Sequence, residues 1–237
     1  GKGGFCDLMC NWERGYDLDL VTKDLGNPFY ILSPGVSIKK YGCCFLNHRP
    51  LEALLLLIEE NNIHYDQVES VRVDVSPMTL SLLRCSEPEN GEQAKFSLQH
   101  SMGAALVDRK VPLPYLKPFT NAGAVDPKYK EARKKINVVV QADLPPGVPH
   151  ASAPPVTVKL KDGRSYSKSA GVDVFRGSPE NPLSKNEFLT RYANCVRGVL
   201  SSQQLQRSID LVYSLENLDN VSELMELATF GGSGPAH

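Results

Sequence analysis

Residues 37–58 read SIKKYGCCFLNHRPLEALLLLI, which brings a lysine, two adjacent thiols and a histidine to the start of a predicted helix. Residues 36–40 alternate between apolar and polar positions as in a strand, whereas large aliphatic residues recur at helical spacing over residues 51–58. Lys39 and His48 are therefore predicted to lie at a strand-to-helix junction, where free helix N–H groups favour an anionic ligand. The alternative is an ordinary connection whose cysteines pack and whose histidine caps the helix.

The size and charge of the chain exclude several classes of protein. Its 237 residues suffice for one large or two small domains. The 26 Lys and Arg residues against 27 Asp and Glu residues give a net charge of −1, which argues against a nucleic-acid partner. The longest apolar run, residues 53–58, is far shorter than the roughly 18 residues of a membrane-spanning helix, and no signal peptide is evident. No membrane partner is predicted.

The six cysteines favour reduced thiols. They stand at positions 6, 10, 43, 44, 85 and 195 without regular spacing, and an adjacent pair is poor geometry for an ordinary disulfide. We therefore expect an intracellular, cytoplasmic protein, or a mitochondrial one if the source is eukaryotic. No metal site is predicted, because the spacing matches no zinc pattern and a second ligand pair is missing.

The middle of the chain is predicted to mix strands and helices. Residues 68–75 alternate as a strand, and residues 78–83 fit a short helix. A single helix is predicted over residues 94–108, and another begins at Asp126-Pro127, with proline at the first helical position. Residues 136–141 are rich in β-branched side chains and are predicted as a strand.

The rest of the chain is predicted to form a hairpin and then helices. A proline-rich loop over residues 144–155 precedes two β-rich runs that flank an Asp-Gly turn, within residues 156–170. Ser184 begins a capping box, Ser202 is predicted to cap a second helix, and Asn220 opens a third. The fold class is therefore α+β, a mixed α/β body with flanking helices.

A second polar set stands on the predicted helix of residues 94–108, where Ser97 and His100 lie among apolar and small residues. A lone histidine in such a place is more often a core residue. Taken in order, however, the junction at Lys39 and His48, this helix and the segment of residues 177–184 resemble the MmgE/PrpD family. That family includes 2-methylcitrate dehydratases, cis-aconitate decarboxylases and iminodisuccinate epimerases.

The resemblance rests on a defined order of residues. Family members carry a lysine, an aromatic residue two positions on, a proline, a pair of cysteines or histidines, and a histidine nine positions after the lysine. Here these correspond to Lys39, Tyr41, Gly42, the pair Cys43-Cys44, and His48.

Three departures from the family pattern bear on the reaction. Gly42 replaces the common proline, which implies a more flexible loop. Cys44 stands where the decarboxylase branch has histidine, and His100 replaces a frequent tyrosine three residues after the serine that corresponds to Ser97. The departures at Cys44 and His100 argue against decarboxylation of cis-aconitate.

The resemblance covers the C-terminal half of such a protein and implies its domains. Residues 1–35 would be the end of a larger all-helical domain, residues 36–173 an α+β lid domain, and residues 174–237 helices that return to the helical domain. The missing N-terminal half, from the same protein or a partner chain, would supply the other side of the cleft, and a homodimer is expected.

The resemblance also implies a cofactor-independent lyase that acts on a citrate-like polycarboxylate. Removing a proton beside a carboxylate concentrates negative charge, so Lys39 is predicted to anchor a carboxylate and stabilise the transition state. His48 or His100 would donate or accept the proton. Tyr41, Cys44 and Ser97 would bind the substrate.

The expected reaction is dehydration, as in 2-methylcitrate dehydratase, with no metal or organic cofactor. Epimerisation or decarboxylation within the same family is the first alternative. A non-catalytic lid-like module that binds a partner or a carboxylate is the second, and a structural remnant with an empty pocket is the third.

Overall fold

The computed structural model describes residue 4 and residues 17–110, 117–142, 155–169, 171 and 176–228. The chain divides into two compact units, Gly1–Ile38 and Lys39–His237. The predicted proline-rich loop lies outside the described residues, except for Pro155. Within the described residues, no helix has both the length and the apolar character needed to cross a membrane.

The first unit contains the short helix α2 (Leu18–Lys23). Asp17 begins this helix, because its carboxylate accepts a hydrogen bond from the backbone N–H of Asp19 at 2.9 Å. The segment that follows exposes several large apolar side chains, including Phe29, Tyr30, Ile31 and Leu32.

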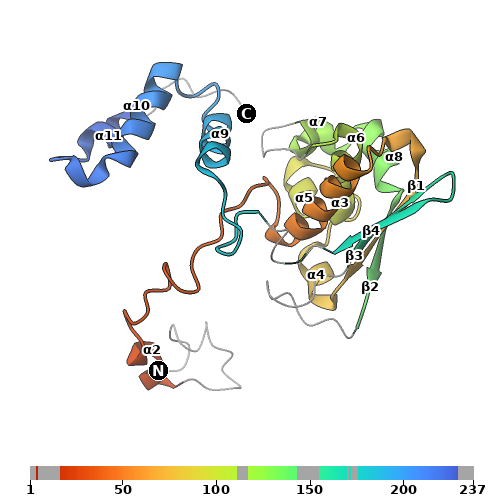
Figure 1. Cartoon of the computed structure of the whole chain (residues 1–237), viewed down its shortest axis with the longest axis horizontal. Helices are drawn as coiled ribbons and strands as arrows, with labels where there is room; N and C mark the ends of the chain where they lie inside the picture. Colours follow the sequence, from red (N-terminus) through yellow and green to blue (C-terminus); the bar gives the residue numbers. More distant parts are fainter. Residues whose placement is uncertain are drawn as a thin grey trace. The chain divides into compact units, whose positions relative to one another are not determined.

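The second unit contains a four-stranded sheet with the order β2-β1-β3-β4 (Figure 1). Strand β1 (Val68–Val75) pairs in parallel with β2 (Ile136–Val140) and antiparallel with β3 (Pro155–Leu160). Strand β4 (Ser165–Ser169) completes the predicted hairpin with β3. These strands confirm the expected α+β class.

Helices cover one side of this sheet (Figure 1). Helix α3 (His48–Glu60) contacts β3 and β4, and α6 (Leu98–Asp108) contacts α3, β2 and α8 (Pro127–Arg133). Val71 and Val73 of β1 are buried, whereas Arg72 between them is exposed, as the period of two requires. The core between the layers is aliphatic and includes Leu51, Leu54, Leu57, Val68, Val71, Leu98, Met102, Val156 and Val158.

The helix predicted over residues 94–108 is two helices, α5 (Gly91–Lys95) and α6. The chain breaks because Ser97 adopts an extended backbone and its hydroxyl accepts a hydrogen bond from the N–H of His100 at 3.1 Å. A serine in this role starts a new helix. The single-helix prediction was therefore wrong at this point.

Short helices fill the remaining connections of the mixed layer. They are α4 (Pro77–Leu82), α7 (Asn121–Ala124) and the 3-10 turns Phe45–Asn47, Tyr65–Gln67 and Lys117–Phe119. Asp126 caps α8 through its carboxylate, with proline at the first position, as the sequence indicates.

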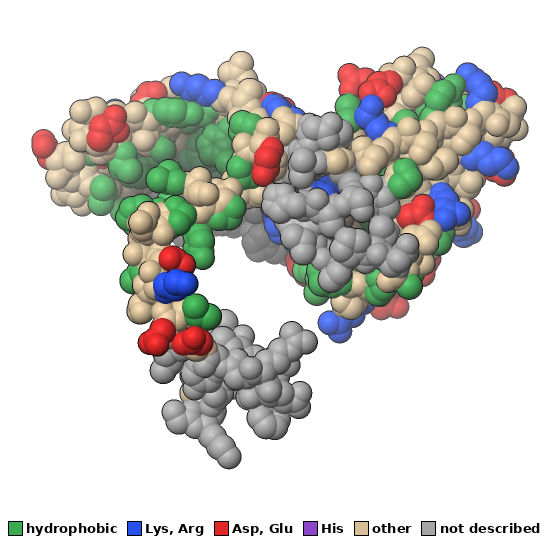
Figure 2. Space-filling view, turned by 60° about the horizontal axis from the view of Figure 1, so that its bottom comes forward, with side chains coloured by type: hydrophobic (Ala, Val, Ile, Leu, Met, Phe, Trp, Pro, Cys, Tyr) green, Lys and Arg blue, Asp and Glu red, His purple; other side chains and the backbone are tan. Residues whose placement is uncertain are grey.

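The C-terminal residues form the predicted helices. These are α9 (Lys185–Cys195), α10 (Ser202–Tyr213) and α11 (Ser222–Ala228), with a 3-10 turn at Leu215–Asn217. Ser184 caps α9 with the expected capping box, but Ser201, not Ser202, caps α10. Figure 2 shows hydrophobic side chains on the surface of the C-terminal helices, and the exposed ones include Val212, Tyr213, Leu215, Val221 and Met225.

Candidate functional site

The segment of residues 39–48, called the loop segment below, enters helix α3 from an irregular backbone. The strand predicted over residues 36–40 is absent from the described structure, where Val36 is 60% exposed and has no neighbouring strand. A strand needs a partner for its backbone groups, and sequence alternation does not supply one. The alternation over residues 36–40 predicts that Lys39 and Lys40 lie on opposite faces of a strand, and the structure does not place them on a strand.

Helix α5 and the start of α6 hold the far end of the loop segment. The carbonyl oxygen of Lys95 accepts hydrogen bonds from the N–H of Cys44 at 2.9 Å and from the side-chain amide of Asn47 at 3.2 Å. The same Asn47 amide lies 3.3 Å from the hydroxyl of Ser101, and Asn47 is fully buried. The loop segment is therefore fixed to the protein core at the entrance of α3.

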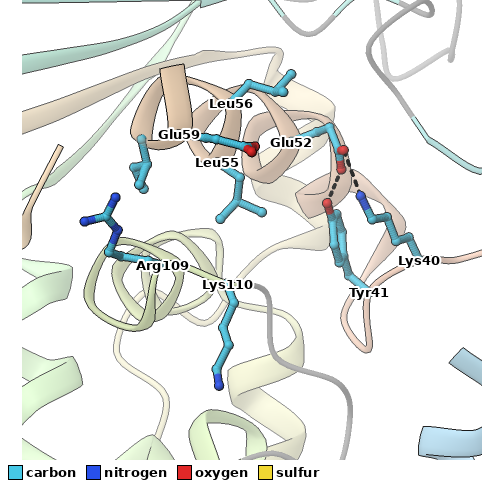
Figure 3. Close-up of a pocket in the computed structure, with 9 residues that line it drawn as sticks. Lys40, Tyr41, Glu52, Leu55, Leu56, Glu59, Arg109 and Lys110 are labelled. Carbon is cyan, nitrogen blue, oxygen red and sulfur yellow. Dashed lines mark hydrogen bonds and ion pairs between the residues drawn. The ribbon is translucent and has the colours of Figure 1, made fainter. Parts of the chain in front are cut away.

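Glu52 of α3 holds the near end of the loop segment (Figure 3). Its carboxylate accepts a hydrogen bond from the ammonium group of Lys40 at 2.9 Å and another from the hydroxyl of Tyr41. Glu52 is only 6% exposed. Sequence reasoning missed this residue, although its position four residues after His48 places both on the same face of a helix.

Lys39 is exposed and forms no ion pair or hydrogen bond within the described part of the chain. The positive charge of Lys39 still acts on the buried His48, because it helps to lower the pKa of that imidazole. Lys40, by contrast, is neutralised by Glu52. The two adjacent lysines therefore differ in what they can offer a ligand.

His48 is fully buried at the first turn of α3. Its ring centroid lies 5.1 Å from that of Tyr41 and 5.4 Å from that of Phe45. Burial lowers the pKa of His48 to about 4, and the nearby positive charges of Lys39 and Arg191 lower it further, while a backbone hydrogen bond to Cys43 opposes the shift. The imidazole is therefore neutral at pH 7.

The two cysteines of the loop segment differ in environment. Cys43 is buried, and desolvation raises the pKa of its thiol to about 12. Cys44 is partly exposed. Among the described residues, no group of three or more His, Cys, Asp and Glu side chains is arranged to hold a metal ion.

His100 and Ser97 lie in a different environment from His48. Both are fully buried, and the hydroxyl of Ser97 is used to cap α6. The Nε2 atom of His100 donates to the carbonyl of Pro118 at 2.7 Å, and its Nδ1 atom lies 3.4 Å from the guanidinium of Arg133. Burial and the nearby Arg133 lower the pKa of His100. These contacts favour a structural role for both residues.

A pocket of about 590 Å³ lies beside helix α3 (Figure 3). Of the six predicted site residues, Tyr41 belongs to its lining. The other five do not: Lys39, Cys44, His48, Ser97 and His100. The structure thus brings Tyr41 and His48 into contact, but it does not gather the three predicted catalytic residues around this pocket. The residues that line it are Lys40, Tyr41, Glu52, Leu55, Leu56, Ile58, Glu59, Arg109 and Lys110.

Comparison with known proteins gives one family and a small set of relatives. The sequence model of the MmgE/PrpD C-terminal domain family matches residues 41–217. A cis-aconitate decarboxylase of Aspergillus terreus is 24% identical over 95% of this chain and 47% of its own length. A cis-aconitate decarboxylase of Mus musculus is 25% identical over 59% of this chain and 28% of its own length. The chain spans about half the length, or less, of these curated relatives.

Proposed function

This chain belongs to the MmgE/PrpD family, and from that membership we propose that it forms the C-terminal part of a lyase acting on a citrate-like polycarboxylate. The observation that carries the proposal is the match over residues 41–217, which includes most of the loop segment and helix α3. The exposed Lys39 lies two residues before it.

The chemistry of such a substrate requires a cation at the reacting carbon. Breaking a C–H or C–C bond beside a carboxylate leaves negative charge next to existing negative charge, so a positioned ammonium group stabilises the transition state more than the ground state. Lys39 is the residue that we assign to this role, because it is exposed and its neighbour Lys40 is already paired with Glu52.

The remaining predicted residues are assigned according to their exposure. Cys44 is partly exposed and would contribute to the site wall, while Tyr41 would act through its contacts with Glu52 and His48. A buried imidazole with a pKa of about 4 is neutral, so His48 would accept rather than donate a proton, and it would need an opening of the loop segment to meet substrate. We give His100 and Ser97 structural roles.

Three reactions are proposed for the complete enzyme. The departures at Cys44 and His100 from the decarboxylase pattern favour dehydration, as in 2-methylcitrate dehydratase. The names of the curated relatives favour decarboxylation of cis-aconitate. Both reactions use the same anchored carboxylate, and epimerisation by proton removal and return remains the third member of this set.

The partner we propose is a helical domain, supplied by the same protein or by another chain, with a homodimer as the expected assembly. The support is the apolar surface of residues 29–32 and of helices α10 and α11, because contiguous exposed apolar side chains mark interaction sites.

The experiment is a substrate screen read by NMR. The product of the complete reading frame and the 237-residue chain are each incubated with 2-methylcitrate, citrate, cis-aconitate and iminodisuccinate. Conversion of one acid by the complete product, and little by the chain alone, supports the proposal. Carboxylate binding without conversion by either protein would instead favour a non-catalytic binding module, the second candidate, which the burial of both histidines supports.

A further inference from the structure

Glu52 connects helix α3 to the loop segment. It lies one helical turn after His48 on α3, so the two side chains share a helix face. Its Oε1 atom accepts from Lys40 at 2.9 Å, and its Oε2 atom accepts from the hydroxyl of Tyr41. The carboxylate therefore holds two successive residues of the loop segment at once.

These partners are also linked to each other. The ammonium nitrogen of Lys40 lies 5.3 Å from the centroid of the Tyr41 ring, a distance at which a cation and an aromatic face attract. The Tyr41 ring also packs near the imidazole of His48, at 5.1 Å between centroids. Glu52 thus sets the position of the ring that packs against His48.

The burial of Glu52 makes its carboxylate depend on Lys40 and Tyr41. Glu52 is 6% exposed, and a buried carboxylate needs partners because solvation by water is lost. Burial and the neighbouring carboxylate raise the pKa of Tyr41, so its hydroxyl keeps its proton and donates a hydrogen bond to the Glu52 oxygen. Since Lys40 is ion-paired with Glu52, Lys39 is the lysine of the loop segment that stays available to bind a carboxylate.

We propose that Glu52 is a positioning residue: it fixes Lys40 and Tyr41 so that the loop segment presents Lys39 outward and keeps Tyr41 against His48. Glu52 acts through these residues and does not touch the substrate. The inference rests on the proposed function for its catalytic consequence, but its structural part can be measured without any turnover.

The test is hydrogen exchange of the loop segment in the complete gene product, measured by mass spectrometry on the Glu52→Gln variant. Glutamine keeps the shape of the side chain but removes the charge that holds Lys40. We expect exchange in peptides covering residues 39–48 to accelerate at least ~10-fold, equivalent to ~1.4 kcal/mol of local stability. Glu69→Gln is the matched control, because Glu69 pairs with Lys159 at 2.8 Å on the exposed side of the sheet.

Steady-state kinetics give the second measurement, on whichever acid the substrate screen identifies. For Glu52→Gln we expect kcat to fall at least ~10-fold with a smaller change in KM, because a misplaced loop impairs transition-state contacts first. If Glu52→Gln does not fold, Tyr41→Phe removes only one of the two bonds and should accelerate exchange in the same peptides.

The outcomes separate this inference from the proposed function. Unchanged exchange in residues 39–48 overturns the positioning role, whether or not the protein has an activity. Faster exchange together with unchanged kcat overturns the link between positioning and catalysis. Faster exchange in a protein that converts none of the four acids leaves Glu52 as the anchor of the loop and defeats the proposed lyase function instead.

Discussion

The adjacent residues Lys39 and Lys40 should differ in their effect on stability when each is replaced by alanine. Lys39→Ala should impair turnover and leave stability nearly unchanged, because its side chain is exposed and unpaired within the described residues. Lys40→Ala should destabilise the protein, because it removes the 2.9 Å ion pair with Glu52, whose side chain is 8% exposed. The contrast comes from their contacts, since the two residues do not lie on a strand.

The expected magnitudes follow from these environments. Deleting one charge that stabilises a transition state costs at least ~100-fold in kcat/KM, or ~2.7 kcal/mol. Breaking a buried ion pair costs ~3–5 kcal/mol. The Lys40 side chain is 32% exposed and Tyr41 still donates to Glu52, so we expect a smaller loss in Lys40→Ala, about 1–2 kcal/mol.

The assay pairs kcat/KM of the complete gene product with urea unfolding of the same variants. Lys39→Met and Lys40→Met serve as controls, because methionine keeps much of the apolar stem and removes only the charge. Equal, mild losses of kcat/KM in both alanine variants, with no difference in unfolding free energy, would mean that Lys39 is an ordinary surface lysine and that the proposed site is misplaced.

Three further outcomes are expected. Gly123→Ala should lower stability by about 3 kcal/mol and the Tm by roughly 6–12 °C in a thermal melt. The reason is that a Cβ at this position would lie 1.6 Å from the carbonyl oxygen of Lys117. A neutral effect would mean that this turn can open freely. The pKa of His48 is about 4 in the folded protein against about 6.5 when unfolded, so the unfolded state takes up the proton first as the pH falls. Stability should therefore decrease between pH 6.5 and 4 by up to about 3 kcal/mol in urea titrations, and a His48→Gln variant with the same slope would refute this. In alkylation followed by mass spectrometry at pH 8, Cys44 should react before Cys43, whose burial raises its thiol pKa to about 12; labelling of both at the same rate in the folded protein would contradict the burial.

Local signals in the sequence determined much of the fold. The capping box at Ser184, the Asp126-Pro127 helix start and the hairpin of β3 and β4 all depend on residues close in the chain. The order of residues from Lys39 to His48 likewise indicated the family that the comparison of residues 41–217 confirmed.

Tertiary structure decided the features that depend on distant partners. Alternation over residues 36–40 predicted a strand, but no neighbouring strand pairs with it in the described structure, whereas β1 gains partners more than 60 positions away in β2 and β3. The contact between Lys40, Tyr41 and Glu52 needs a folded loop against α3, and the burial of His100 needs α8 and Pro118 packed around it. Sequence patterns report what the near neighbours of a residue favour, while pairing, burial and charge neutralisation depend on which distant groups the fold brings within a few ångströms.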